Sequence, residues 1–326
     1  MIDKEAVFNI KSKLQFEQLA LQVFKHQFKN NRVYRSFCDL LYMHPSDVKT
    51  IKNIPFLPIQ FFKSHTVISS KEKAQETFTS SGTTGQTTSK HFVTDISLYE
   101  QSFRNGFKHF YGNIEDYVVL ALLPSYLERD GSSLIYMVND MISNSKQPES
   151  GFYLDDLDSL KNILIDLESQ NKKTILIGVS FALLDFVERY KLKLKNTIVM
   201  ETGGMKGKRK ELIRTELHEI LKQGFGVNTI HSEYGMTELL SQAYSKDNSL
   251  FKTPPWMQVL TRDTEDALTI QSHGKTGGIN IIDLANMNSC AFIATQDLGK
   301  VYKDGSFEVL GRFDNSDIRG CNLMVI

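Results

Sequence analysis

The amino-acid sequence predicts an α/β fold with a β-rich subdomain at its C-terminal end. Between residues 117 and 230, short apolar stretches that suit buried strands alternate with amphipathic stretches that suit helices. This alternation is typical of a mostly parallel sheet covered by helices. After about Phe251 the helical periodicity ends, and strand-like segments follow one another between Gly, Asp and Asn turns. We therefore expect an α/β region over residues 1–250 and a β-rich subdomain over residues 251–326.

The N-terminal part is expected to be helical and then irregular. Apolar residues recur at helical spacing over residues 5–29, which predicts an amphipathic helix. Two prolines in residues 54–63 exclude a continuous helix there, so the large apolar side chains of that segment must be buried or line a pocket. Asp95 then stands where a helix that extends through residue 110 needs an N-cap.

Strands and helices are expected to alternate through the centre of the chain, on the same periodicity argument. The expected central strands are residues 117–123, 174–177, 197–200 and 228–230. The expected helices are residues 132–143, 157–169, 181–190 and 208–222. In the C-terminal region, strands are expected at residues 267–270, 278–282, 291–295 and 307–310.

Composition excludes several classes of protein. The 326 residues are 41% hydrophobic and 10% aromatic, which favours a large folded core over disorder. Lys+Arg and Asp+Glu are both 38, so the net charge is +0 and provides no field that would attract nucleic acid or an anionic membrane. Charged residues near the start take the place of the apolar part of a signal peptide, and the apolar runs are too short to cross a bilayer. We expect a cytoplasmic protein without a membrane span.

Three cysteines are present, and their spacing fits neither a zinc site nor a disulfide framework. Cys38, Cys290 and Cys321 form no C-x-x-C pair, and an odd number cannot all pair with one another. Reduced thiols are therefore expected. Cys38 and Cys290 are interpreted as small buried hydrophobic residues. Cys321 differs because it lies close to the last residue, where a thiol can reach a partner.

Residues 79–90, TSSGTTGQTTSK, form the most informative motif. Gly82 and Gly85 let the backbone take positive φ values and approach a ligand closely, and the neighbouring hydroxyl groups add donors for anionic oxygens. The pattern is neither a Walker A loop nor a dinucleotide fingerprint. We interpret it as a cradle for the phosphates of a nucleotide. The alternative is a flexible Ser/Thr linker, because such compositions often mark one.

Residues 231–238, HSEYGMTE, form a second motif directly after an expected strand. Open α/β sheets place ligand groups at such positions. Tyr234 offers a ring that can stack on a base, Thr237 a hydroxyl for a phosphate, and Glu238 a carboxylate for Mg²⁺ bound to phosphate oxygens. His91 and His231 stand beside the two motifs and are interpreted as structural histidines.

These motifs resemble those of a known group of enzymes. With TQD at residues 295–297 and GRFD at residues 311–314, four motifs occur in the order and at roughly the spacing of the adenylate-forming enzymes. The chain is further similar to the acyl-protein synthetase (LuxE-type) branch, from about residue 50 to the end. The segments that carry this narrower resemblance are PFLPI at 55–59, LPSYLER at 123–129, TGGMKG at 202–207 and IRGCNL at 318–323.

The resemblance implies the large-domain fold of adenylate-forming enzymes without their mobile C-terminal domain. It implies that a carboxylic acid, with a fatty acid as the expected class, is activated with ATP and Mg²⁺. It assigns Ser80, Ser81, Gly82, Thr83, Thr84 and Gly85 to the ATP phosphates; Gly203, Gly204 and Tyr234 to the adenine; Asp297 and Arg312 to the ribose; Thr237 to the α-phosphate; Glu238 to the metal; and Cys321 to the acyl group. The acyl group would pass to a partner acyl reductase or an acyl carrier protein.

Two features depart from the ordinary adenylate-forming pattern. Residues 86–90, QTTSK, stand where those enzymes have Pro-Lys, and the sequence ends at Ile326, before the second catalytic lysine of a mobile domain. The role of Lys90 and the cation near the α-phosphate therefore stay open. Two alternatives to the acyl-protein synthetase remain: a ligase that uses coenzyme A as direct acceptor, and a non-catalytic subunit that anchors a reductase complex.

Overall fold

The computed structural model describes residues 2–80, 87–124, 131–203 and 212–312, and its larger sheet has the predicted parallel arrangement. The strand order in this six-stranded sheet is β5-β4-β6-β7-β8-β9, and all neighbours are parallel except β8 and β9. The strands are β4 (Val118–Leu122), β5 (Gly151–Phe152), β6 (Thr174–Val179), β7 (Thr197–Thr202), β8 (His231–Tyr234) and β9 (Ala243–Ser245).

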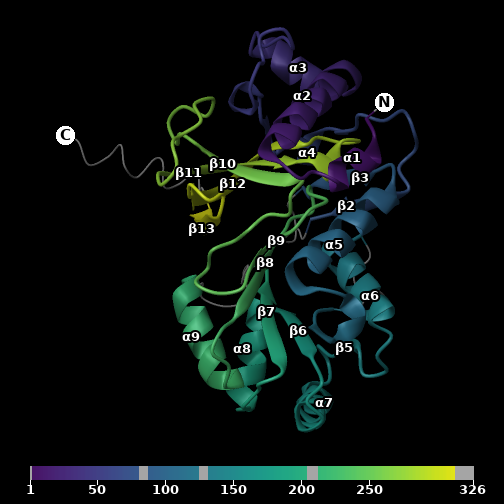
Figure 1. The fold of residues 1–326 in the computed structure, drawn as a ribbon, viewed down its shortest axis with the longest axis vertical. Coiled ribbons are helices and arrows are strands. Elements are labelled where there is room, and N and C mark those ends of the chain that lie inside the picture. Colours follow the sequence, from purple (N-terminus) through teal and green to yellow (C-terminus); the bar gives the residue numbers. More distant parts are fainter. Residues whose placement is uncertain (1, 81–86, 125–130, 204–211, 313–326) are drawn as a thin grey trace, which may run out of the picture.

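Helices cover both faces of this sheet (Figure 1). One face packs against α5 (Ile96–Tyr111) and α6 (Ser133–Ser145), and the other against α7 (Leu157–Ser169), α8 (Ser180–Arg189) and α9 (Arg214–Phe225). Three of these helices begin at side-chain N-caps: the side chains of Asp95, Ser132 and Asp156 accept hydrogen bonds from the first turns of α5, α6 and α7. The predicted helices at 132–143, 157–169 and 181–190 are confirmed within two residues.

The second sheet contains most of the C-terminal region. β10 (Met257–Arg262), β11 (Thr276–Asp283) and β12 (Phe292–Val301) are antiparallel neighbours, and β13 (Phe307–Arg312) pairs with the far part of β12. β1 (Leu57–Pro58) adds to β12 in parallel, so the Pro-rich segment supplies an edge strand to a sheet formed much later in the chain.

The N-terminal segment is more divided than the expected single helix. It forms α1 (Lys4–Phe8), α2 (Lys13–Asn30) and α3 (Arg32–Leu40), with Ser12 as the N-cap of α2. Asn31 both ends α2 and caps α3, because its side chain accepts from the N–H of Tyr34. The remaining short elements are η1 (Ile51–Asn53), α4 (Phe61–Ser64), β2 (Glu76–Thr79), β3 (Lys90–Val93), η2 (Ile114–Asp116) and η3 (Leu284–Asn286).

Two expected strands and one helix start are wrong. The strand expected at 228–230 lies at 231–234 instead, in a sequence too polar to be recognised as a strand. Residues 267–270 form no strand, and Ile270 only makes an isolated bridge to Arg262. The last central helix begins at Arg214; residues 208–211 of the expected helix lie outside the described residues.

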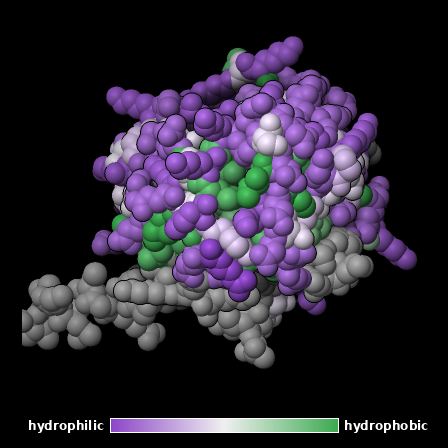
Figure 2. Space-filling model, turned by 90° about the horizontal axis from the view of Figure 1, so that it is seen from below, coloured by the Kyte–Doolittle hydropathy of each residue, from purple (hydrophilic) through white to green (hydrophobic). Residues whose placement is uncertain are grey.

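Two hydrophobic clusters lie on opposite faces of the parallel sheet. The larger one extends from the N-terminal helices through α5 and α6 into the second sheet, with Phe24, Tyr34 and Phe56 packed around Phe292. The smaller one lies between the sheet and α7, α8 and α9. The surface seen from below is mostly hydrophilic, with a limited apolar area near its middle (Figure 2). Among the described residues, no helix has both the length and the apolar character needed to cross a membrane.

Candidate functional site

The carboxyl ends of the parallel strands meet at one edge of the larger sheet. Val179 at the end of β6 pairs with Thr202 at the end of β7, and Thr202 pairs with Glu233 near the end of β8. Tyr234 ends β8, the segment after it carries Gly-Met-Thr-Glu at residues 235–238, and Gly203 follows β7 directly. Ligands of open α/β sheets bind outside such an edge. The second motif was predicted to follow a strand, but its first four residues form β8 itself and only residues 235–238 follow the strand.

The β2–β3 hairpin places the base of the hydroxyl–glycine loop at the same edge. The N–H of Thr79 donates to the carbonyl of Gly131 at 2.7 Å, just after the segment that follows β4. The loop is closed at its base, because Ser80 N donates to Ser89 O at 3.1 Å and Ser89 N donates to Ser80 Oγ at 2.9 Å. Five loop residues assigned to phosphate binding lie outside the described residues: Ser81, Gly82, Thr83, Thr84 and Gly85.

Tyr234, Asp297 and Arg312 are connected although they come from three motifs. The Tyr234 hydroxyl donates to Asp297 Oδ2 at 2.7 Å, and Arg312 Nε lies 3.4 Å from Asp297 Oδ1. Burial raises the pKa of Tyr234 well above its usual value, so its hydroxyl keeps the proton that this bond requires. The ring packs against Phe251 and Phe307, with centroids 5.8 and 5.6 Å away. The structure therefore brings these three predicted residues together.

The Thr-Glu part of the motif is held through its backbone. His91 Nδ1 lies 2.8 Å from the carbonyl oxygen of Thr237, and Asn286 Nδ2 donates to the carbonyl oxygen of Glu238 at 2.8 Å. Just beyond, Asp283 accepts hydrogen bonds from the N–H groups of residues 240 and 241 at 2.8 and 3.0 Å. Thr237 is half-buried and the Glu238 residue is 5% exposed.

Two buried carboxyl groups near the strand ends were not predicted from the sequence. Glu233, on β8, accepts from the hydroxyl of Thr202, and burial raises its pKa to about 7. Glu201, on β7, faces the opposite side of the sheet. Burial opposes its ionisation, but the contact with His218 and the charge of Arg214 hold its pKa below the usual value. Each lies two residues before a glycine, Gly203 or Gly235, and this shared position is the signal that could have identified them.

Two arginines were also not predicted: Arg214 contacts both sheets, and Arg262 crosses the strands of the second sheet. Arg214 Nε lies 3.3 Å from Glu201 Oε1, and its guanidinium carbon lies 4.9 Å from the ring centre of Phe251. Arg262 donates to the carbonyl oxygens of Ile279 at 2.7 Å and Thr295 at 2.6 Å, so it holds the strand segment that leads to Asp297. Both depend on partners distant in sequence, which local patterns do not reveal.

Of the remaining predicted residues, Gly203 and Lys90 lie in the described part of the chain. Gly203 has a φ of +71°, a conformation that favours glycine, and its carbonyl accepts from Ser180 Oγ at 3.2 Å. Lys90 begins β3 and is exposed. Gly204 and Cys321 lie outside the described residues.

Magnesium is compatible with the groups present. In the described part of the chain, no cluster of three or more His, Cys, Asp or Glu side chains could hold a metal by itself. Mg²⁺ usually takes one or two carboxylates and completes its shell with water and phosphate oxygens. A single carboxylate at Glu238, beside the expected phosphate site, fits this mode of binding.

Comparisons with known proteins agree with this arrangement. The family model for the acyl-protein synthetase LuxE matches residues 5–105 and 134–326. A structure of 2-hydroxyisobutyryl-CoA ligase with 2-HIB-AMP and CoA aligns with a TM-score of 0.67 at 11% identity, over 93% of this chain and 70% of that chain. ATP-bound MatB from Rhodopseudomonas palustris aligns with a TM-score of 0.54 at 17% identity, over 72% of this chain and 47% of that chain.

The chain thus corresponds to about half the length of the MatB structures. No curated protein matches the sequence. At these identities the structural likeness shows the fold alone, which is the mixed α/β fold of adenylate-forming ligases. The family model, by contrast, covers most of the sequence and includes all four motifs. The chain belongs to the acyl-protein synthetase (LuxE) family.

Proposed function

We propose that this protein activates a carboxylic acid with ATP and then carries the acyl group on the thiol of Cys321. A carboxylate oxygen attacks the α-phosphorus of ATP, the bond from this phosphorus to the bridging oxygen breaks, and pyrophosphate leaves. The thiolate of Cys321, whose proton passes to solvent, attacks the acyl carbon of the acyl-adenylate, and AMP leaves. Two easier steps replace one difficult acyl transfer.

The observation that carries this proposal is the connection of Tyr234, Asp297 and Arg312 at the edge where the other motifs end. In our proposal, Asp297 and Arg312 bind the ribose, and Tyr234, together with Gly203 and Gly204, borders the adenine. The hydroxyl–glycine loop, from Ser80 to Gly85, binds the phosphates. The closed base of the hairpin supports this role, because it holds both ends of the loop beside the strand ends.

Thr237 and Glu238 are proposed to act at the α-phosphate. The Thr237 hydroxyl would donate to an α-phosphate oxygen, and the Glu238 carboxylate would hold Mg²⁺. When bound, Mg²⁺ supplies positive charge that offsets the charge on the phosphate oxygens. The backbone contacts of both residues with His91 and Asn286 support a fixed geometry at this point.

Membership of the family supports a proposal for the substrate class and the acyl acceptor. We propose a fatty acid as the substrate and an acyl reductase or an acyl carrier protein as the receiver of the acyl group. Two structural neighbours hold chemically related molecules: MatB holds ATP, and 2-hydroxyisobutyryl-CoA ligase holds an acyl-AMP and CoA.

The test is ATP–pyrophosphate exchange over a panel of carboxylic acids of increasing chain length. The parent protein should show exchange with at least one acid and should retain labelled acid as a hydroxylamine-sensitive thioester. Cys321→Ser should keep the exchange and lose the label, because the thiol takes no part in adenylation. Cys38→Ser and Cys290→Ser are the matched controls and should keep both. A Cys321→Ser protein that retains the label contradicts the thioester role.

A second function, a carboxylate–CoA ligase, is favoured by the likeness to a ligase structure that contains CoA. In that case the parent forms acyl-CoA directly and never retains label on a cysteine. Absence of exchange with every acid of the panel would instead favour a non-catalytic subunit.

A further inference from the structure

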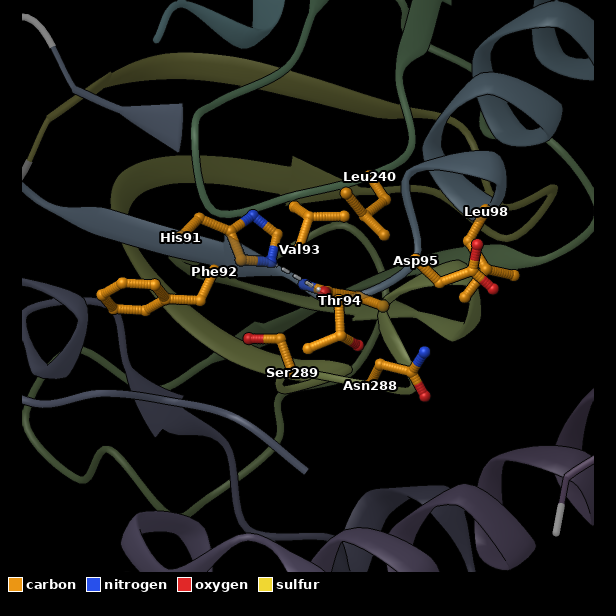
Figure 3. Close-up of a pocket in the computed structure, with 10 residues that line it drawn as sticks. His91, Phe92, Val93, Thr94, Asp95, Leu98, Leu240, Asn288 and Ser289 are labelled. Atoms are coloured by element: carbon orange, nitrogen blue, oxygen red, sulfur yellow. Dashed lines mark hydrogen bonds between the residues drawn. The ribbon is translucent and has the colours of Figure 1, made fainter. Parts of the chain in front are cut away.

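The imidazole of His91 lies between the loop hairpin and the segment after β8. His91 belongs to β3, two residues after the base of the loop at Ser89, and it is fully buried. Nδ1 lies 2.8 Å from Thr237 O, and Nε2 lies 3.0 Å from Asn286 Oδ1. Figure 3 shows the ring turned inward beside a small cavity, with the second contact drawn as a dashed line.

Asn286 contacts both His91 and the backbone of Glu238, the residue after Thr237. It ends η3, is 1% exposed, and donates from Nδ2 to Glu238 O at 2.8 Å. Two consecutive carbonyl groups, those of Thr237 and Glu238, are therefore tied to one buried pair of side chains. The pair joins three segments that are far apart in the sequence: β3, the loop after β8, and η3.

Histidine is well suited to this position because it presents polar atoms on two sides of a rigid ring. An asparagine amide reaches the place of Nδ1, and a glutamine amide reaches the place of Nε2, but neither reaches both. Burial lowers the pKa of His91 to about 4, which favours a neutral ring with one N–H near pH 7. Thr237 O and Asn286 Oδ1 are both acceptors, so this one N–H donates to one of them at a time. This agrees with its interpretation as a structural histidine.

We propose that His91 and Asn286 are positioning residues that fix the Thr237–Glu238 backbone relative to the phosphate-binding hairpin. The inference rests on the proposed function, because the distance between loop and motif matters only if both hold the same nucleotide. A misplaced backbone at Thr237 and Glu238 would displace the hydroxyl and the carboxylate together. Neighbours that orient ligand groups in this way typically contribute about 10–100-fold in metal affinity or activity.

The test compares four variants of the full chain. His91→Phe keeps a ring of similar size but removes both polar contacts, and we expect a fall of about 10–100-fold in kcat for ATP–pyrophosphate exchange. His91→Asn and His91→Gln each restore one contact, and the better of them should recover most of the loss; this comparison also shows which ring nitrogen carries the hydrogen. His231→Phe is the matched control, since His231 begins β8, at the end of that strand away from Thr237 and Glu238.

Two measurements separate positioning from a general loss of stability. The first is calorimetric measurement of ATP affinity with and without Mg²⁺. His91→Phe should reduce the increase in affinity that Mg²⁺ causes more than it reduces the affinity for ATP alone. Hydrogen–deuterium exchange over residues 235–241 should be faster in His91→Phe and unchanged in His231→Phe. His91→Phe and Asn286→Ala should be clearly non-additive, because they break one connected contact.

The possible results distinguish the two proposals. A parent protein without pyrophosphate exchange contradicts the proposed function, and the hydrogen-exchange comparison then still tests the backbone positioning. The inference is overturned if the parent shows full exchange and His91→Phe does not differ from it. The quantities compared are the kcat, the increase in ATP affinity caused by Mg²⁺, and the protection from hydrogen exchange at residues 235–241. If His91→Phe fails to fold, the same measurements are made on His91→Asn and His91→Gln. The inference is refuted if neither of these variants differs from the parent.

Discussion

At the scale of single residues, neighbouring strands bury two carboxyl groups in opposite environments. Glu201 has a cation beside it, because Arg214 Nε lies 3.3 Å away. Glu233 instead accepts a hydrogen bond from the neutral hydroxyl of Thr202, and it lies near the tyrosines Tyr99 and Tyr244. Desolvation therefore raises the pKa of Glu233. At Glu201 desolvation is also the largest single effect, but the hydrogen bond with His218 and the charge of Arg214 together outweigh it and lower the pKa.

Glu233→Gln should stabilise the protein at high pH and not at low pH. The folded state holds the Glu233 proton up to about pH 7, whereas an ordinary glutamate releases it near 4.5. Between these values the folded state binds more protons, so the free energy of unfolding falls as the pH rises. Glutamine, which mimics the protonated form, should therefore add roughly 3 kcal/mol at pH 8 and little near pH 4.5.

Urea unfolding of both proteins between pH 4.5 and 8 measures this difference. Glu265→Gln is the control, because Glu265 is exposed and its change should have no such pH dependence. A difference between Glu233→Gln and the parent that is constant across pH would mean that the carboxyl titrates normally.

At the scale of elements, the second sheet is arranged around the side chain of Arg262. Its guanidinium crosses from β10 over β11 to the carbonyl of Thr295 on β12. This path is open only because Gly278 has no side chain: a Cβ there would lie 2.5 Å from Arg262 Cζ. Glycine usually weakens a strand, but here it permits a contact that holds the segment before Asp297.

Gly278→Ala should destabilise the protein by about 1–3 kcal/mol, because the fixed guanidinium cannot move aside without losing its hydrogen bonds. In an Arg262→Ala background the same change should cost much less, since the colliding group is gone. Thermal or urea unfolding of the two single variants and the double variant measures this coupling. Additive losses would show that the strain arises elsewhere.

At the scale of the whole molecule, one hydrophobic cluster joins the N-terminal helices to both sheets. Trp256, the only tryptophan, lies at the centre of this connection. Its indole N–H donates to Ser102 on α5 and to Ser241 at 3.0 Å each, and its ring lies 5.1 Å from that of Phe8.

Unfolding should therefore be a single transition. Tryptophan fluorescence reports on this junction, and far-UV circular dichroism reports on the helices of the larger sheet, so their urea midpoints should coincide. Two separated midpoints would mean that the residues before and after about 251 unfold as independent units.

Sequence patterns predicted those elements whose signals are local. Residues 157–169 form a helix with the predicted bounds because Asp156 caps it and Leu160, Leu164 and Leu167 recur on one face. β8 was misplaced because its polar residues become acceptable in a sheet only through distant partners, such as His218 beside Ser232.

In the site, too, local motifs could be predicted and contacts between distant residues could not. Motifs predicted Tyr234, Asp297 and Arg312, which the structure joins. His91 and Arg262 could not be recognised as contacts of those motifs, because their partners lie 146 and 33 residues away in the sequence. Such roles depend on tertiary packing, which a single sequence does not display.

The pairing of the N-terminal helices with the C-terminal sheet has a consequence for synthesis on the ribosome. Gln27, on α2, donates to the carbonyls of Asn286 and Met287, which are 259 and 260 residues further along the chain. Phe24 on the same helix packs against Phe292. These groups have no final partners until residues 286–292 have been synthesised, so a nascent chain exposes a large apolar face throughout that interval. That interval is when aggregation or a need for chaperones is greatest.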